Sequence, residues 1–160
     1  MKKRVLLFAT FALGACAGRP PEQITANANA LAVAKAQFAL TPQLRMEIAQ
    51  TTVGVIRRSA FLSQRTFSSP TISDVKTDAG YKDLFGGSLD STPFYCVRFM
   101  SHEMFFEAPV IITIGVIDSG GGARTFRGLF AAGRHPVKCE HDANYVPFPE
   151  LAAAYPASGK

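Results

Sequence analysis

The sequence predicts an α+β fold, with one or two N-terminal helices packed on a mostly antiparallel four- to five-stranded sheet. In the first half of the chain, apolar residues recur at helical spacing, for example at Leu44, Ile48 and Val55. From Ser68 onwards the apolar period changes to two, and turn-forming residues separate short runs rich in β-branched and aromatic side chains. The three glycines at 120–122 predict a hairpin, because glycine readily adopts the positive φ of a tight connection.

The first fifteen residues have the pattern of an export signal. Lys2, Lys3 and Arg4 provide a positively charged start, and residues 5–13 are almost entirely apolar. This stretch is too short to span a bilayer, since a transmembrane helix needs about 20 apolar residues. We therefore expect residues 1–15 to be a signal peptide that is removed from the mature protein.

The end of this segment, Leu13-Gly14-Ala15-Cys16, resembles the lipobox of bacterial lipoproteins. The resemblance implies cleavage before Cys16, a diacylglyceryl group on its sulfur and, in many bacteria, an acyl chain on the new amino terminus. Such a protein is anchored to the membrane by lipid and faces the periplasm. Ala17 stands where an aspartate usually signals inner-membrane retention, which favours the outer membrane. The alternative is an ordinary secretory signal cut near Ala15 or Ala17.

The mature chain is expected to begin with a tether. Residues 16–29 combine an arginine, two prolines and small polar side chains without apolar periodicity, which is typical of a flexible linker. Residues 30–160 then form a single domain. A first helix is expected over 25–40, where alanines accompany a modest apolar face that includes Leu31 and Phe38.

The second helix has clearer boundary signals. Thr41 suits the N-cap position, and Pro42 suits the first helical position because its missing N–H is not needed there. The apolar spacing predicts that this helix continues to about residues 59–62.

The predicted strands follow from the period of two. Ile112 and Ile114 fall on one face of their strand while Ile111 and Ile117 fall on the other, so both faces of this strand are expected to be covered. The expected strands are 71–77, 94–101, 110–118, 124–131 and 137–145.

The charge of the mature chain is modest. Removing the first three basic residues with the signal reduces the 17 basic side chains to 14, against 12 acidic ones, a balance of +2. Short basic pairs remain, such as Arg57 with Arg58, but none forms the dense run expected for nucleic-acid binding. We therefore expect no nucleic-acid partner.

Two cysteines remain once Cys16 is assigned to lipid. Cys96 and Cys139 would lie in an oxidising compartment, where such a pair usually closes. We therefore predict a disulfide between them. Closing a loop of roughly 40 residues stabilises the fold by about 4 kcal/mol in the simple polymer description.

The histidines provide a second class of function. His135, Cys139 and His141 occur in the run HPVKCEHD, and His102 precedes Glu103. These side chains include zinc-ligand types, yet neither a C-x-x-C nor an H-E-x-x-H arrangement is present, and a disulfide would consume the thiolate. The preferred interpretation is surface histidines beside a disulfide, without metal or cofactor. The alternative is a small ligand- or metal-binding module, or a hydrolase, that uses His102, His135 and His141.

Other catalytic patterns are weak. The G-x-S-x-G elbow of serine hydrolases is missing, and Ser88 and Ser91 have no evident base nearby. The glycine run lacks the Gly-Lys-Ser/Thr sequence of a phosphate-binding loop. Two carboxylate pairs could in principle perform glycoside chemistry, although solvated side chains are the preferred interpretation. The pairs are Glu103 with Glu107 and Glu140 with Asp142.

A Met/Phe cluster provides the candidate contact surface. Met104, Phe105 and Phe106 follow a predicted strand at the start of a loop that we expect to end at Pro109. Exposed apolar side chains at such a position mark a partner or membrane contact. Core packing is the simpler interpretation of the same residues.

The sequence therefore favours a non-catalytic envelope lipoprotein, anchored by lipid on Cys16, whose sheet domain docks on another envelope protein. The possible contact residues are Met104, Phe105 and Phe106, and no catalytic residue is expected. The layout resembles that of many small Gram-negative envelope lipoproteins. That resemblance rests on the lipobox and the layout, not on a motif inside the domain.

Overall fold

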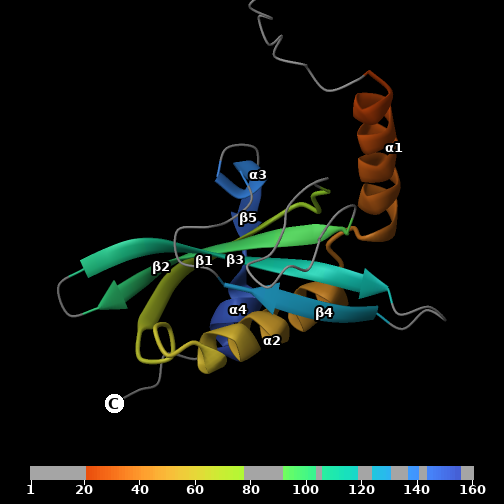
Figure 1. The fold of residues 1–160 in the computed structure, drawn as a ribbon. Helices are drawn as coiled ribbons and strands as arrows, with labels where there is room; N and C mark the ends of the chain where they lie inside the picture. The colour runs from red at the N-terminus through yellow and green to blue at the C-terminus, as the bar shows by residue number, and fades with distance from the viewer. Residues whose placement is uncertain are drawn as a thin grey trace, which may run out of the picture.

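The α+β fold expected from the sequence is confirmed. The computed structural model describes residues 21–77, 92–103, 106–118, 124–130, 137–140 and 144–155. Within them, five strands form one sheet in the order β4-β3-β2-β1-β5, and every neighbouring pair is antiparallel (Figure 1). The strands are β1 (Thr66–Ser73), β2 (Phe94–Glu103), β3 (Phe106–Asp118), β4 (Arg124–Leu129) and β5 (Tyr145–Pro147).

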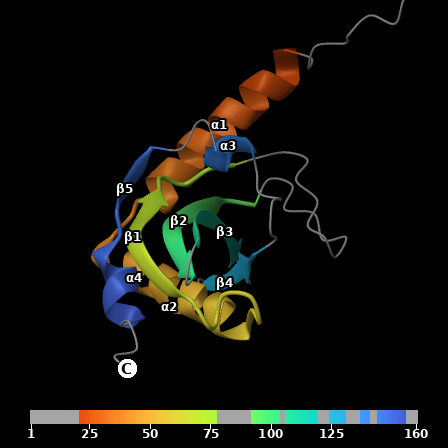
Figure 2. The same ribbon diagram turned by 90° about the vertical axis from the view of Figure 1, so that its left-hand side faces the viewer.

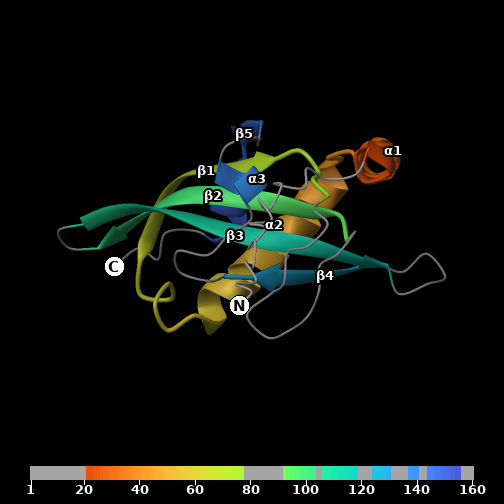
Figure 3. The same ribbon diagram turned by 45° about the horizontal axis from the view of Figure 1, so that its top comes forward.

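Helix α2 (Pro42–Arg58) lies across one face of the sheet (Figure 3). The predicted start is confirmed, because the Leu44 amide donates to the Thr41 side chain over 3.2 Å and Pro42 opens the first turn. The short helix α4 (Pro149–Ala154) packs beside α2 on this same face. We call the helix-covered side the inner face of the sheet.

The core lies between α2, α4 and the inner face. Leu44, Ile48 and Ile56 of α2 recur at helical spacing and are buried against the sheet. At Gly128 of β4 the helix comes so close that an added Cβ would lie 2.2 Å from the Val55 side chain. The strand residues of this core include Ile72, Tyr95, Val97, Phe99, Val110, Ile112, Ile114 and Val116.

Arg45 joins the two inner helices at the edge of this core. Its guanidinium donates to both carboxylate oxygens of Glu150, over 2.6 and 2.8 Å, and to the Pro147 carbonyl over 2.6 Å. The hydrogen bonds from Arg45 lower the pKa of the Glu150 carboxyl below its ordinary value.

Helix α1 (Pro21–Gln37) stands at one end of the sheet and leads away from it (Figure 1). Its last part and the following turn enter the core through Ala34 and Phe38. The Tyr95 hydroxyl donates to the Phe38 carbonyl over 2.6 Å, and burial raises the pKa of this hydroxyl. Lys35 forms an ion pair with Asp74 after β1.

The predicted tether before α1 needs correction. The tether was expected to extend to residue 29, but residues 21–29 already belong to α1. The Pro20-Pro21 pair suggests a linker, yet a proline fits the first helical position and the alanine-rich sequence after it favours a helix.

Two strands also differ from the prediction. The first begins at Thr66 instead of 71 and ends at Ser73, because Ser69 and Pro70, which suggest a turn, form an irregularity inside β1. The expected strand over 137–145 is wrong. Residues Val137–Glu140 form the short helix α3, and only Tyr145–Pro147 pair with β1.

The predicted loop that ends at Pro109 is wrong as well. Phe106 already belongs to β3 and pairs with Glu103, so only residues 104 and 105 separate β2 from β3. Pro109 is tolerated inside β3 because the described part of β4 pairs only with Thr113 to Asp118, which leaves one side of β3 unpaired at Pro109. β3 and β4 pair antiparallel up to Asp118 and Arg124, and residues 119–123 between them lie outside the described residues.

Several predicted features lie outside the described residues. They are the signal peptide, the lipobox with Cys16, the glycine run 120–122, and Ser88, Ser91, Met104, Phe105, His135, His141 and Asp142. None of the helices in the described segments combines the length and apolar character needed to cross a bilayer.

Candidate functional site

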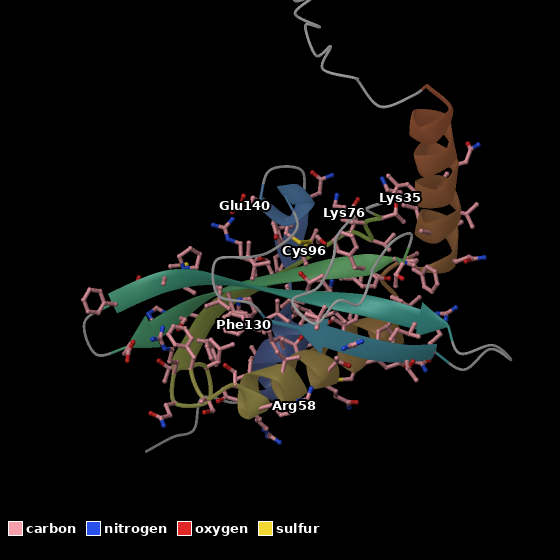
Figure 4. The ribbon with its side chains drawn as sticks, viewed as in Figure 1. Lys35, Arg58, Lys76, Cys96, Phe130 and Glu140 are labelled. Atoms are coloured by element: carbon pink, nitrogen blue, oxygen red, sulfur yellow. A yellow bond between two sulfur atoms is a disulfide. The ribbon has the colours of Figure 1, made fainter. Side chains whose placement is uncertain are left out.

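The outer face of the sheet, opposite α2, has two different halves. In one half, Cys96 of β2 is joined to Cys139 of α3 by a disulfide with a Cα–Cα distance of 5.6 Å, as the sequence predicted. Phe94 completes this small buried cluster, with Ile111 and Tyr145 packed against it. Figure 4 shows Cys96 on the sheet beneath α3, which carries Glu140. The disulfide thus holds the short helix on the outer face.

Tyr145 reinforces this half of the outer face. Its hydroxyl donates to the Cys139 carbonyl over 2.7 Å. Burial raises the pKa of Tyr145 to about 12, and the nearby Arg98 guanidinium partly offsets that effect. The hydroxyl therefore stays protonated and keeps its hydrogen bond through the neutral pH range.

The other half of the outer face carries a row of polar side chains across three strands. His102 of β2 lies directly opposite Glu107 of β3 in the register. Ser68 of β1 pairs with Met100, two residues before His102, so Ser68 is a diagonal neighbour of the histidine on the same face. The register therefore places Ser68, His102 and Glu107 in sequence across the sheet.

The side chains in this row are hydrogen-bonded to one another. The Ser68 hydroxyl oxygen lies 2.5 Å from His102 Nε2, and His102 Nδ1 lies 2.9 Å from Glu107 Oε1. A carboxylate can only accept, so Nδ1 carries the proton that it shares with Glu107. In the neutral ring Nε2 is then the acceptor, and the Ser68 hydroxyl donates to it.

The backbone beside Ser68 is irregular. Ser69 has a φ of 52°, the only positive value at a non-glycine residue among the described segments. The register of β1 with β2 shifts between Ser68 and Thr71, so the chain bulges directly after Ser68. Backbone strain of this kind costs about 1–3 kcal/mol and is concentrated at functional sites.

A surface groove of about 520 Å³ reaches His102, the central member of the row. His102, Thr66 and Glu103 line it from the strands, and residues of the turn after α2 line the other side. Arg65 in that turn pairs with Glu103, donates to Ser101 and lies 3.7 Å from the centre of the Phe61 ring. The groove is therefore mostly polar, with one aromatic wall.

Two aromatic side chains are exposed at this end of the sheet. Phe106, at the start of β3, is 74% exposed, and Phe61, on the groove wall, is 51% exposed. We call the part of the molecule formed by Phe61, Phe106 and the groove the hairpin end. Figure 2 views the fold from this end, and Figure 1 shows that the hairpin end lies away from α1 along the sheet.

The other sequence candidates do not converge in the same way. Glu103 and Glu107 are not a catalytic pair, because their register positions put them on opposite faces, where Glu103 binds Arg65 and Glu107 binds His102. Glu140 lies in α3 and not in a strand, and Asp142 lies outside the described residues. Among the described residues, no group of three His, Cys, Asp or Glu side chains could hold a metal ion.

Ser68 was not among the candidate residues predicted from the sequence, although it is the partner of His102. The contact between His102 and Glu107 could have been predicted from the sequence. These two residues flank a short hairpin, so they face each other once the position of its turn is known. Nothing in the local sequence marks Ser68, which lies 34 residues before His102 and joins it only through the β1–β2 register.

The chain matches no protein-family model, no curated protein and no solved structure. The assignment of a candidate site to Ser68, His102 and Glu107 therefore rests on the geometry of these residues alone.

Proposed function

We propose that this protein is a lipoprotein of the bacterial cell envelope that docks on another envelope protein through its hairpin end. Lipid on Cys16 anchors it in the membrane, and the outer membrane is the favoured location because Ala17 follows the cysteine. The observation that carries the docking part is the exposure of Phe106 at the tip of the β2–β3 hairpin, 74% of its surface.

An exposed phenylalanine at a hairpin tip favours contact with a partner. Aromatic side chains are enriched in the buried centres of protein interfaces, where a few anchors contribute most of the affinity. Phe106 and Phe61 lie at the same end, and Phe61 lines the polar groove. An apolar anchor beside charged Arg65 and Glu103 matches the anatomy of an interface with a polar rim.

The position of α1 agrees with this arrangement. Its 17 residues span about 25 Å at 1.5 Å per residue, and the helix leads away from the end of the sheet opposite the hairpin end (Figure 1). A lipid on Cys16, a few residues before α1, would hold that end of the molecule at the membrane. The hairpin end would then be the part most accessible to a partner.

The disulfide supports the compartment part of the proposal. A buried cysteine pair that closes a long loop is typical of oxidising spaces such as the periplasm. Together with the lipobox-like sequence before Cys16, it favours export over a cytoplasmic location.

The anchor is tested by the intact mass of the native protein extracted from membranes. We expect a chain that begins at Cys16 with added lipid, and no lipid on a Cys16→Ser variant. A full-length or unlipidated chain would contradict the anchor while leaving the docking surface to be judged separately.

The docking surface is tested by site-specific photo-crosslinking in living cells. A photoreactive phenylalanine analogue replaces Phe106 in one variant and Val33 in a matched control, because Val33 is an exposed apolar residue of α1 at the other end. We expect a discrete crosslinked envelope protein from position 106 and none from position 33. Equal crosslinking from both positions, or none from 106, would contradict docking through the hairpin end.

A further inference from the structure

We propose that Ser68, His102 and Glu107 form a serine-type hydrolytic site that cleaves small esters, an activity beyond the docking function. In this site Ser68 is the nucleophile, His102 is the general base and acid, and Glu107 is a positioning residue that orients the imidazole. The juxtaposition that carries the proposal is one hydroxyl, one imidazole and one carboxylate bonded in that order across β1, β2 and β3.

The order of contacts is the one that nucleophilic catalysis requires. Ser68 contacts Nε2 and Glu107 contacts Nδ1, so the two ring nitrogens have different partners. The carboxylate fixes the tautomer with the proton on Nδ1, which leaves a lone pair on Nε2 for the serine proton. The reverse arrangement would hold a donating nitrogen against the hydroxyl and could not activate it.

The alignment of Ser68, His102 and Glu107 is not needed to satisfy their hydrogen bonds. Ser68 and His102 are only half-buried and Glu107 is exposed, so water could satisfy each of them without a mutual alignment. The unusual backbone of Ser69 directly follows the proposed nucleophile, at a bulge in β1. α/β-Hydrolases also expose their nucleophilic serine on a strained turn. In this protein the comparable feature is a bulge in a β-strand of a different fold.

The reaction proceeds in two balanced steps. The Ser68 oxygen attacks the ester carbonyl carbon while its proton passes to His102 Nε2, and that proton then goes to the departing alcohol as the ester C–O bond breaks. Water next attacks the acyl carbon and gives a proton to His102. The bond between the acyl carbon and Ser68 breaks, the serine regains the proton, and a free carboxylic acid leaves.

The groove indicates the class of ester. It is open and lined mainly by polar side chains, among them Gln64, Thr66 and Arg65, with Phe61 as a single aromatic wall. A long acyl chain would find no continuous apolar channel in this lining. We therefore assign a short acyl group, such as acetyl, carried on a polar alcohol.

The first experiment labels the detergent-solubilised full-length protein with a fluorophosphonate, which reacts only with an activated serine. Peptide mass spectrometry is expected to find the adduct on Ser68, and p-nitrophenyl acetate hydrolysis is expected to be saturable. This measurement needs no variant, so it decides the proposal even if changes at Ser68 unfold the protein. An adduct on another residue, or no adduct, would overturn it.

Matched variants then assign the roles. Ser68→Ala should abolish labelling and lower ester hydrolysis about 100-fold or more, whereas Ser63→Ala, at an exposed serine outside the row, should behave as the parent. Glu107→Gln should lower kcat about tenfold with an unchanged KM, because it affects the orientation of His102 and not substrate binding. Hydrolysis that persists in Ser68→Ala would refute the site.

The two proposals fail independently. Crosslinking from position 106, measured in the Ser68→Ala background, reports on docking alone, and fluorophosphonate labelling of the parent protein reports on the hydrolytic site alone.

Discussion

The two faces of the sheet are covered in different ways. The inner face is apolar where α2 and α4 bury it with residues such as Ile48 and Leu151, and it carries Ser101 and Glu103 toward the hairpin end. The outer face has one small buried cluster around the disulfide and then the polar row with the groove beside it. The same strands thus contribute to a packed apolar core on one side and carry a row of hydrogen-bonded polar side chains on the other.

This difference shows where a small domain can hold a polar site. On the inner face, a serine and a histidine would be buried against α2, where unpaired polar groups cost about 1–3 kcal/mol each. On the outer face, Ser68 and His102 keep access to water, and His102 also lines the groove. The inner face therefore holds the main apolar core, and the outer face leaves room for polar side chains that reach water.

The strongest test of the outer face is removal of its disulfide. Replacing both Cys96 and Cys139 by alanine should lower the free energy of unfolding by about 4 kcal/mol, because the bridge closes a loop between positions 43 residues apart. Urea unfolding followed by circular dichroism measures the loss. Reduction of the parent protein should produce a similar shift, and a loss below about 1 kcal/mol would show that the outer cluster is not a main support.

Two adjacent isoleucines of β3 compare the faces directly. Ile112 points to the inner face and is fully buried, whereas Ile111 points to the outer face and is only half-buried. Ile112→Ala should cost about 3 kcal/mol, since it leaves a cavity under α2, and Ile111→Ala about 1 kcal/mol. The same urea titration measures both, and equal losses would mean that the outer face is packed as firmly as the inner one.

The parts of the fold that sequence could predict depend on local signals. The start of α2 followed from Thr41 and Pro42, and its buried face from helical spacing, because both are properties of neighbouring residues. Strand β5 gave no such signal. It has three residues and is defined by pairing with β1, more than 70 positions earlier in the chain.

The candidate site also combines a residue that local sequence marks with a contact that only the strand pairing creates. His102 could be selected as a candidate from its residue type, but its partnership with Ser68 depends on the register of β1, and the bulge after Ser68 shifts that register. The expected strand began at residue 71 and so left out the part of β1 that contains the serine. Local propensity therefore predicted the elements better than their pairing.

Substitutions at two glycines test how closely α2 packs on the inner face. Gly128→Ala on β4 should lower the free energy of unfolding by about 2 kcal/mol, because the added Cβ would meet the Val55 side chain at 2.2 Å. Gly54→Ala is the matched control within α2, where the nearest atom lies 3.4 Å away at the end of the Arg58 side chain. This control should be stabilising by about 0.5–1 kcal/mol, since alanine favours a helix. Thermal unfolding of both variants checks the opposite signs.

The smallest effect concerns the ion pair at the edge of the inner face. The Arg45 hydrogen bonds lower the pKa of Glu150 in the folded protein, so the ionised carboxylate binds more strongly than the protonated form. Glu150→Gln should cost about 1 kcal/mol at neutral pH, since the pair is partly exposed to solvent.

The pH dependence of that cost identifies its origin. The contribution of Glu150 is fully present above the pKa of the unfolded chain, about 4.3, and is lost as the pH falls through the lower folded value. Urea titrations of the parent and Glu150→Gln between pH 7 and 2 should therefore converge at the acid end. Curves that stay parallel would assign the cost to packing of the α2–α4 edge, because a charge interaction must disappear when the carboxylate is protonated.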